Sequence, residues 1–305
     1  FLSFNVTILG SNSAVPAHKR SPTAQVLHHT QNRFLIDCGE GTQFQMIKYH
    51  IKRAKLDNIF ISHLHGDHYL GLVGLLSTMM LNGRTEDLHI YAPAHLEKIL
   101  AVNFDTGRDK ICNYEIVFHA LTFEKSYKIF ENNDLEVFTI PLDHKIDCNG
   151  FLFKEKLADR KIISEKIKEL SIPYAEITQI KKGADFITKD GKTIKNDTLT
   201  LDPEKPKSYA YCSDTKYNES VLPIIEGADL LYHESTFMHD LVDIAGDRFH
   251  STSIEAATIA QKAKVSKLII GHFSARYRDL EPMLTESQTV FENTALGIEG
   301  TIFEV

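Results

Sequence analysis

The pattern of apolar and polar positions alternates between short strands and amphipathic helices along the whole chain. Short apolar runs bounded by turn-forming residues predict strands, and apolar positions three or four residues apart predict helices. The predicted strands are 4–9, 24–28, 33–37, 58–62, 88–91, 115–120, 135–140, 150–154, 208–212, 230–233, 267–270 and 300–304. The predicted helices are 42–50, 70–80, 94–104, 164–170, 219–226, 253–263 and 280–291. This mixture has no regular βαβ rhythm and favours sheets packed between helices.

Residues 154–207 differ from the rest of the pattern. They carry 13 Lys and Arg and 10 Asp and Glu, in a chain whose net charge is −7. Asp190-Gly191 lies between two apolar stretches and predicts a hairpin turn. We therefore expect a single domain over residues 1–305 with an inserted arm at 154–207. Because charged runs are usually just solvated faces, an arm with no partner stays open as the alternative.

The composition of the 305 residues, 43% hydrophobic and 25% charged, is that of an ordinary soluble globular protein. No apolar run approaches the length needed to cross a bilayer, so no membrane partner is expected. The first ten residues lack the basic start and cleavage site of a signal peptide. The four cysteines, at 38, 112, 148 and 212, form no Cys-x-x-Cys pair and predict neither a thiolate zinc site nor disulfides. A cytoplasmic location is expected, although the sequence opens on Phe1 and leaves a trimmed leader open.

The strongest chemical signal is the run His-Leu-His-Gly-Asp-His at residues 63–68, which follows a predicted strand. In an extended chain residues i and i+2 point the same way, so His63 and His65 can reach one ion. The intervening glycine allows a sharp turn, after which Asp67 and His68 can face a second ion. Imidazole and carboxylate ligands suit Zn²⁺, although Mn²⁺ or Fe²⁺ would also be accepted. The run predicts a metal pair, with a cluster of surface histidines as the weaker alternative.

Three more residues of metal-ligand type come just after predicted strands. They are His144, Asp214 and His272. Each alone is as consistent with a hydrogen-bonded polar residue as with a ligand. Residues at neighbouring strand ends converge in a folded chain, so together with the first run they form a coherent set.

These residues resemble the signature of the metallo-β-lactamase superfamily. The resemblance implies an α/β fold, the αβ/βα sandwich in which two mixed β-sheets lie between helices. It also implies that His63, His65 and His144 hold one zinc ion, that Asp67, His68 and His272 hold the other, and that Asp214 bridges them. Asp37 resembles the first, mainly structural, motif of the superfamily.

Motifs in the C-terminal third are more specific. The strings at 231–237, 250–252 and 271–277 resemble the His-Glu-Ala-Thr, His-Ser-Thr and His-Phe-Ser-x-Arg-Tyr motifs of ribonuclease Z, the family of tRNA 3′-processing endonucleases. The resemblance implies a zinc-dependent endoribonuclease that cleaves the 3′ trailer from precursor tRNA. The tRNA would keep a 3′-hydroxyl and the trailer a 5′-phosphate. Two Zn²⁺ per subunit and a homodimer, in which one subunit's arm serves the other's active site, are also implied.

The sequence departs from the family pattern in three places. Ser235 stands where the family has Ala. The loop at 16–21 matches the family's Pro-x-Lys-x-Arg-Asn loop only at Pro16 and Arg20. In the arm, residues 175–177 replace a Gly-Pro-Leu stretch. We therefore expect differences in how the RNA 3′ end is recognised and in the shape of the arm.

The resemblance also suggests roles in zinc-assisted hydrolysis of a phosphodiester. Asp67 would orient or deprotonate the attacking water. His250 would donate a proton to the leaving oxygen, with Glu234 holding its imidazole. The alternative for His250 is that it caps the helix that begins near 253. The residues expected to contact phosphate or RNA are Arg276, Ser274, Arg20 and Lys19.

Two rival functions remain at this stage. The first is a metallo-β-lactamase-fold phosphodiesterase that acts on small or cyclic phosphodiesters and needs no arm. The second is a non-catalytic RNA-binding scaffold, against which the complete set of ligand-type residues argues.

Overall fold

Two seven-stranded sheets form the frame of the chain in a computed structural model that describes residues 4–104 and 113–305. The first sheet has the order β18 (Ile302–Glu304), β1 (Phe4–Gly10), β2 (Ala24–His29), β3 (Asn32–Ile36), β4 (Leu56–Phe60), β5 (Leu88–Pro93) and β6 (Ile116–Leu121). The second has the order β17 (Thr294–Leu296), β16 (Lys267–Gly271), β15 (Leu230–Glu234), β14 (Ser208–Cys212), β9 (Cys148–Glu155), β8 (Leu135–Leu142) and β7 (Lys128–Glu131).

Both sheets contain a run of parallel strands. Pairing is antiparallel from β18 through β3 and parallel from β3 through β6. In the second sheet β14, β15, β16 and β17 are parallel. The carboxyl ends of parallel neighbours lie at the same edge of a sheet, where ligand-binding residues commonly gather. Most of the predicted ligand residues follow such ends, and His144 follows β8.

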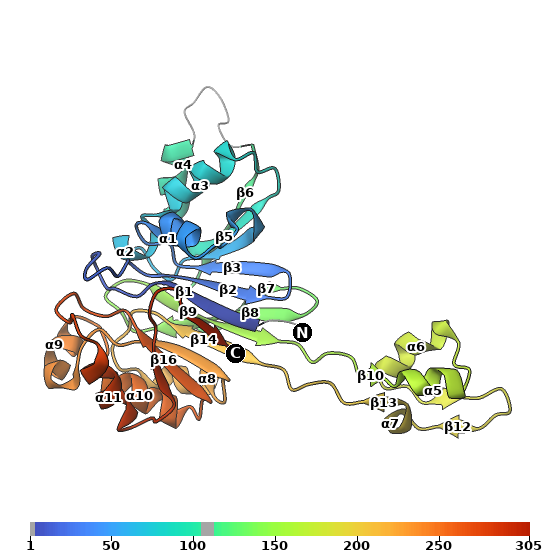
Figure 1. Cartoon of the computed structure of the whole chain (residues 1–305). Coiled ribbons are helices and arrows are strands. Elements are labelled where there is room, and N and C mark those ends of the chain that lie inside the picture. The colour runs from blue at the N-terminus through green and yellow to red at the C-terminus, as the bar shows by residue number, and fades with distance from the viewer. Residues whose placement is uncertain (1–3, 105–112) are drawn as a thin grey trace. The chain divides into compact units, whose positions relative to one another are not determined.

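Aromatic side chains fill the space between the two sheets. Phe34 of β3 lies 5.7 Å from Phe153 of β9, measured between ring centroids, and Phe60 of β4 lies 5.3 Å from Phe151. The helices cover the outer faces (Figure 1): α1 (Thr42–Lys48), α2 (Gly66–Tyr69), α3 (Leu72–Leu81) and α4 (His95–Phe104) on the first sheet, and α8 (Leu222–Ile225), α10 (Ser253–Lys262) and α11 (Glu281–Gln288) on the second. Helix α9 (Val242–Asp247) contacts the 3₁₀ turn η3 (His239–Leu241) that precedes it. The expected sandwich of two mixed sheets between helices is confirmed.

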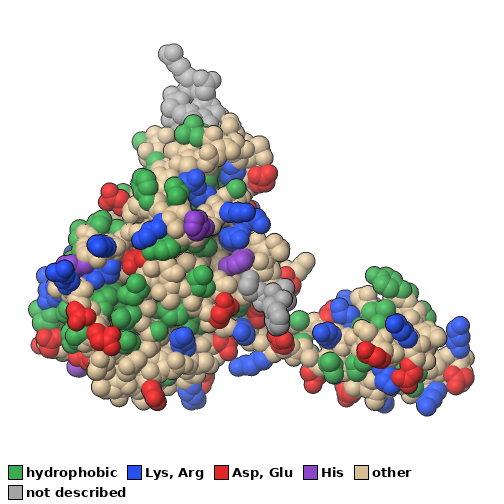
Figure 2. Space-filling view, in the orientation of Figure 1, with side chains coloured by type: hydrophobic (Ala, Val, Ile, Leu, Met, Phe, Trp, Pro, Cys, Tyr) green, Lys and Arg blue, Asp and Glu red, His purple; other side chains and the backbone are tan. Residues whose placement is uncertain are grey.

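Residues Glu131–Glu136 and Lys154–Lys207 form a second compact unit with its own apolar centre, made by Ile172, Ile180, Phe186 and Leu199. Its elements are β10 (Lys161–Ile162), α5 (Ser164–Glu169), α6 (Tyr174–Lys181), β11 (Phe186–Ile187), β12 (Thr193–Ile194), α7 (Asn196–Leu199) and β13 (Thr200–Leu201). Strands β11 and β12 pair antiparallel around Asp190-Gly191, so the predicted hairpin is confirmed. Basic and acidic side chains are interspersed on the surface of this unit (Figure 2).

Several elements differ from the sequence pattern for local reasons. The predicted helix 70–80 corresponds to α3, which begins two residues later, just after Gly71. A Cβ on Gly71 would lie 2.1 Å from the carbonyl oxygen of Gly39, so only glycine allows this approach. The predicted helix 219–226 begins as a 3₁₀ turn, η2 (Glu219–Val221), before α8. The α-helices and strands not predicted from the sequence are all eight residues long or shorter: α2, α6, α7, α9, β7, β10, β13 and β17.

Among the described residues, no helix combines the length and apolar character that a membrane span requires. The three described cysteines, Cys38, Cys148 and Cys212, are buried free thiols, whereas Cys112 lies outside the described residues. Burial raises the pKa of Cys38 and Cys212 to about 12. A role as thiolate metal ligands is therefore disfavoured for these two cysteines.

Candidate metal centre and active site

The predicted ligands come together at the ends of strands from both sheets. They are His63, His65, Asp67, His68, His144, Asp214 and His272. Four of them follow β4 closely, where the chain turns into α2. The others follow β8, β14 and β16 within one or two residues. The ends of these four strands thus bring together residues that are up to about 200 positions apart in the sequence.

The first group consists of three imidazoles and one carboxylate. Nδ1 of His65 lies 3.1 Å from Nε2 of His63 and 3.1 Å from Nε2 of His144. Oδ2 of Asp214 lies 3.6 Å from Nε2 of His63 and 3.8 Å from Nε2 of His144. Four nitrogen and oxygen atoms of ligand type therefore surround one point, as a tetrahedral zinc site requires.

The second group uses the other oxygen of the same carboxylate. Oδ1 of Asp214 lies 3.4 Å from Nε2 of His68 and 3.2 Å from Nε2 of His272. Oδ2 of Asp67 lies 3.5 Å from Nε2 of His68 and 3.4 Å from Nε2 of His272. Asp214 therefore presents one oxygen to each group, as expected of a bridging ligand.

The chemistry of this donor set fits divalent metal ions. Nε2 of His68 and Oδ1 of Asp214 are buried, and neither has a hydrogen-bond partner. Burial opposes the charge on Asp214, but the neighbouring imidazoles of His272, His68 and His63 hold its pKa well below the usual range. Burial lowers the pKa of His63 and of His144, which favours the neutral imidazoles that bind metal. Burying polar atoms that have no hydrogen-bond partner costs free energy, and a cation bound between these atoms would offset that cost.

Asp37 orients one of the ligand imidazoles and the backbone beside it. Its two oxygens accept hydrogen bonds from the amide of Ser62 (2.7 Å), the hydroxyl of Ser62 (2.9 Å) and the hydroxyl of Tyr211 (2.7 Å). Nδ1 of His68 lies 2.8 Å from Oδ2 of Asp37. A carboxylate that accepts the hydrogen of one ring nitrogen orients the imidazole and leaves the other nitrogen free for metal. This arrangement fits the structural role expected for Asp37.

Two other imidazoles are oriented in the same way. Nδ1 of His144 lies 2.9 Å from the carbonyl oxygen of Phe249, and Nδ1 of His272 lies 2.9 Å from Oγ1 of Thr236. In both rings Nε2 then faces the cluster. Thr236 belongs to the motif at residues 231–237, but its contact with His272 was not expected from the sequence.

Glu234 and His250 form a pair beside the cluster. Nδ1 of His250 lies 2.7 Å from Oε1 of Glu234, which is fully buried. Burial alone would lower the pKa of His250, but the charge of Glu234 outweighs it and raises that pKa to about 9. The helix that begins at Ser253 is capped by Thr252 in a capping box with Glu255. The capping alternative for His250 is therefore wrong.

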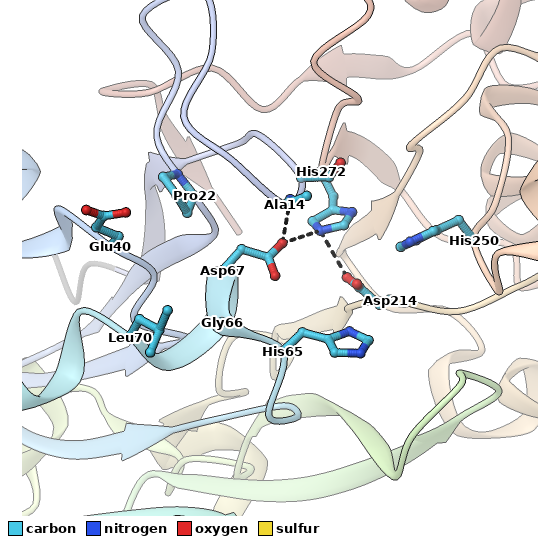
Figure 3. A pocket seen from close by; sticks show the side chains of 11 residues that line it. Ala14, Pro22, Glu40, His65, Gly66, Asp67, Leu70, Asp214, His250 and His272 are labelled. Carbon is cyan, nitrogen blue, oxygen red and sulfur yellow. Dashed lines mark hydrogen bonds and ion pairs between the residues drawn. The ribbon is translucent and has the colours of Figure 1, made fainter.

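A cavity of about 350 Å³ opens over the cluster. Carboxylate and imidazole side chains line one side of the cavity and face one another in Figure 3: Asp67, Asp214, His65, His250 and His272. Pro22, Glu40 and Leu70 line the other side (Figure 3). Neither Glu40 nor Leu70 was predicted, since nothing in their residue type marks them as cavity residues.

The residues expected to contact RNA differ in their accessibility. Arg276 and Lys19 are exposed, and the guanidinium of Arg276 lies 5.2 Å from the ring centroid of Phe237. Ser274 is half-buried in the same loop as Arg276. Arg20 is buried, and its guanidinium donates to Oδ1 of Asn12 (2.8 Å) and to the carbonyl oxygen of Tyr277 (2.7 Å). Its contacts favour a role inside the protein over direct contact with RNA.

Gly39 provides a test of how tightly the cluster is packed. A Cβ at this position would lie 2.4 Å from the carbonyl oxygen of Asp67 and 2.6 Å from Cβ of Pro22. We expect Gly39→Ala to displace Asp67, to weaken metal binding and to destabilise the fold by about 1–3 kcal/mol. Metal content and thermal unfolding measure both effects.

The matched control is Gly246→Ala, which adds the same methyl group in α9, where a Cβ meets no atom within 4 Å. This change should leave metal content unaltered and raise stability by roughly 0.5–1 kcal/mol. Equal metal content in both variants would contradict the tight packing of Gly39 against Asp67.

Comparisons with known proteins agree with this geometry. Residues 4–197 match the family described as anti-Pycsar protein Apyc1. The chain is 44% identical to the ribonuclease Z of Parabacteroides distasonis over 297 residues, which is 97% of each chain. The crystal structure of human tRNase Z, short form, superposes with a TM-score of 0.72 at 25% identity and covers 98% of both chains. The metallo-β-lactamase fold protein YhfI of Bacillus subtilis has a TM-score of 0.69 at 19% identity and covers 99% of this chain and all of its own.

Proposed function

Since this chain belongs to the ribonuclease Z family, and its residues 4–197 to the family described as anti-Pycsar protein Apyc1, we propose that it is a metal-dependent endoribonuclease that cleaves the 3′ trailer from precursor tRNA. The observation that carries this function is the convergence of the His and Asp cluster in a chain that matches ribonuclease Z from end to end. The tRNA product would carry a 3′-hydroxyl and the trailer a 5′-phosphate. The direct test is cleavage of a precursor tRNA with the cut site mapped, with and without a chelator.

The metal we propose is zinc, two ions per subunit. His63, His65 and His144 would hold one ion, Asp67, His68 and His272 the other, and Asp214 both, because its two oxygens face different groups. When bound, such ions lower the pKa of a water molecule toward neutrality and offset the negative charge that develops on the phosphate. The ligand types also accept Mn²⁺ or Fe²⁺, so elemental analysis of the purified protein decides the metal.

Asp67 is proposed to orient the attacking water by accepting a hydrogen bond from it. The exposed fraction of the Asp67 side chain is 9%, and the residue lines the cavity. Burial opposes its ionisation, but His68 and His272 hold its pKa far below the ordinary value. The carboxylate is therefore ionised and able to accept a hydrogen bond from water.

His250 is proposed to donate a proton to the leaving 3′-oxygen. Glu234 accepts the hydrogen on Nδ1, so Nε2 remains as the donor toward the cavity. Glu234 is itself held by the amides of Thr215 (3.0 Å) and Thr236 (3.0 Å), which keep it in place. A buried carboxylate in this position favours the protonated imidazole that a general acid needs.

Arg276, Ser274 and Lys19 are proposed to contact the phosphate backbone of the RNA. The planar guanidinium of Arg276 suits two oxygens of one phosphate. Arg20, with its guanidinium bonded to Asn12 and Tyr277, is proposed to shape the surrounding loop instead.

The unit that contains residues 154–207 is proposed to bind tRNA away from the active site. Residues 154–207 carry 13 Lys and Arg and 10 Asp and Glu in a chain that is acidic overall, and the unit has its own apolar centre. From the resemblance to ribonuclease Z we also propose a homodimer and a cytoplasmic location. Phe44 and Ile47, 70% and 57% exposed on one face of α1, are apolar side chains available for such a contact.

Deleting residues 157–206 tests the role of the arm. The cut leaves the hydrogen bond between the amide of Glu155 and the carbonyl of Lys207, so a short Gly-Ser linker can join the ends. We expect kcat/KM for precursor tRNA to fall at least about 10-fold, since phosphate contacts supply much of the affinity for nucleic acid. Hydrolysis of a small chromogenic phosphodiester should remain, because the metal cluster lies outside the deletion.

Unchanged cleavage of precursor tRNA by the deletion variant would contradict the arm proposal. It would favour the second candidate function, a phosphodiesterase for small or cyclic phosphodiesters. A cavity of about 350 Å³ is large enough for a small ligand, which supports keeping this alternative. The control is a full-length chain with the same linker inserted at Asp190-Gly191, the exposed turn of the arm hairpin.

A further inference from the structure

The loop between β1 and β2, which we call the 11–21 loop, is closed at its base by one carboxylate from near the C-terminus. Oε1 of Glu299 accepts hydrogen bonds from the amide of Ser11 (3.1 Å), the hydroxyl of Ser11 (3.0 Å) and the amide of Ser21 (2.9 Å). Ser11 and Ser21 are the first and last residues of the loop. Hydrogen bonds to an ionised carboxylate are roughly twice as strong as those between neutral groups. Glu299 therefore holds both ends of the loop together.

The loop reaches from this base to the metal cluster. The amide of Ala14 donates a hydrogen bond to Oδ2 of Asp67 at 2.7 Å (Figure 3). Ala14 has a φ of 60°, a left-handed conformation that a residue other than glycine keeps only where its surroundings hold it. Ala14 is exposed, whereas Ser11 is fully buried. The buried base of the loop therefore determines where the exposed amide points.

The same loop also holds the segment that follows His272. The amide of Ser13 donates to the carbonyl oxygen of Phe273 (3.0 Å), and Nε2 of His18 lies 2.8 Å from the carbonyl oxygen of Ala275. The guanidinium of Arg20 donates to the carbonyl oxygen of Tyr277. Asp67 and His272 belong to the same candidate metal group, so the loop contacts that group from two sides.

We propose that Glu299 is a positioning residue for the active site, because it fixes the 11–21 loop so that the Ala14 amide orients Asp67. The inference rests on the metal-binding role proposed for Asp67. A carboxylate oxygen has two lone pairs, so Oδ2 can accept the Ala14 amide and still face the metal group. Without that amide, the Asp67 carboxylate is free to rotate away from the orientation that metal and water require.

Residues that orient a metal ligand indicate how much metal affinity and activity should fall when Glu299 is replaced. Partners that orient a metal ligand typically change metal affinity or activity by about 10- to 100-fold when they are removed. We expect Glu299→Ala to weaken metal affinity and to lower kcat within that range. The KM for precursor tRNA should change little, because Glu299 does not line the cavity. Glu299→Gln keeps an acceptor oxygen but loses the charge, so its effect should be smaller.

The matched control is Asp229→Asn. Oδ2 of Asp229 accepts the amide of Ser208 (2.8 Å) and the hydroxyl of Ser208 (3.1 Å), which is the same kind of contact as that between Glu299 and Ser11. These residues lie at the amino ends of β14 and β15, opposite the ends that carry the cluster. Asp229→Asn should lower thermal stability without altering metal affinity or kcat.

The experiment measures metal affinity by competition with a chromogenic chelator, together with kcat, KM and the thermal unfolding midpoint, for the parent and all three variants. Weaker metal binding in both Glu299 variants but not in Asp229→Asn supports the proposal. Metal affinity and kcat equal to those of the parent in a folded Glu299→Gln would overturn it, and so would equal losses in Glu299→Gln and Asp229→Asn. If Glu299→Ala does not fold, Glu299→Gln decides. The chelator assay needs no RNA, so failure of the tRNA function and failure of this inference are distinguishable.

Discussion

Replacing Asp214 by Ala should abolish cleavage of precursor tRNA, with a loss in kcat/KM of about 10³-fold or more. Among the described residues, Asp214 alone presents an oxygen to both candidate metal groups, with Oδ1 near His68 and His272 and Oδ2 near His63 and His144. Its removal leaves the first group with imidazoles alone and the second with Asp67 as its single carboxylate, so less negative charge remains to hold two cations. We therefore expect metal content, measured by elemental analysis, to fall together with activity.

The conservative variant Asp214→Asn sharpens this prediction. Its side chain has the same shape but only one oxygen and no charge, so it can face only one of the two groups with an acceptor. We expect it to keep part of the metal and little of the activity. Full activity with unchanged metal content in either variant would show that Asp214 is a buried polar residue and not a bridging ligand.

Replacing His250 by Ala should lower kcat for precursor tRNA by about 10²–10⁴-fold, the range for loss of a general acid. Metal content should not change, because the ligands in both proposed groups remain. The measurement is single-turnover cleavage at saturating enzyme, which separates chemistry from product release. Glu234→Gln should give a smaller loss, since the imidazole stays but loses the carboxylate beside Nδ1.

The leaving group provides the control for His250. A phosphodiester with a p-nitrophenolate leaving group needs no protonation, because the phenolate is already a weak base. His250→Ala should therefore hydrolyse it almost as well as the parent, while cleavage of RNA collapses. Equal losses on both substrates would indicate that His250 supports the structure of the site or binds metal, as its proximity to Asp214 and His272 would also allow.

The pattern of the sequence predicted much of the fold. The strand 208–212 has the predicted bounds, and most of the other strands and helices differ from theirs by one to three residues. Short elements such as β17 and α7 were missed, because three or four residues contain too little periodicity to detect. The predicted helix at 70–80 begins at Leu72 as α3, after Gly71, which packs against the backbone at Gly39 in a contact that no local pattern reveals.

The sequence by itself determined the kind of chemistry, because residues such as His63 and Asp214 reveal their ligand type wherever they lie. It also placed them just after strands, whereas the packing of the two sheets decided that these strand ends meet. Only the tertiary structure decided which oxygen of Asp214 faces which imidazoles. It also showed that the guanidinium of Arg20 donates its hydrogen bonds to Asn12 and Tyr277 inside the protein. It alone joined Glu299 to Ser11, 288 residues away, and the Ala14 amide to Asp67. Nearly every residue has a backbone amide, so residue type does not show which amide binds a side chain. A carboxylate hundreds of residues away has no characteristic spacing from its partner either. Such contacts are therefore seen only in the folded structure.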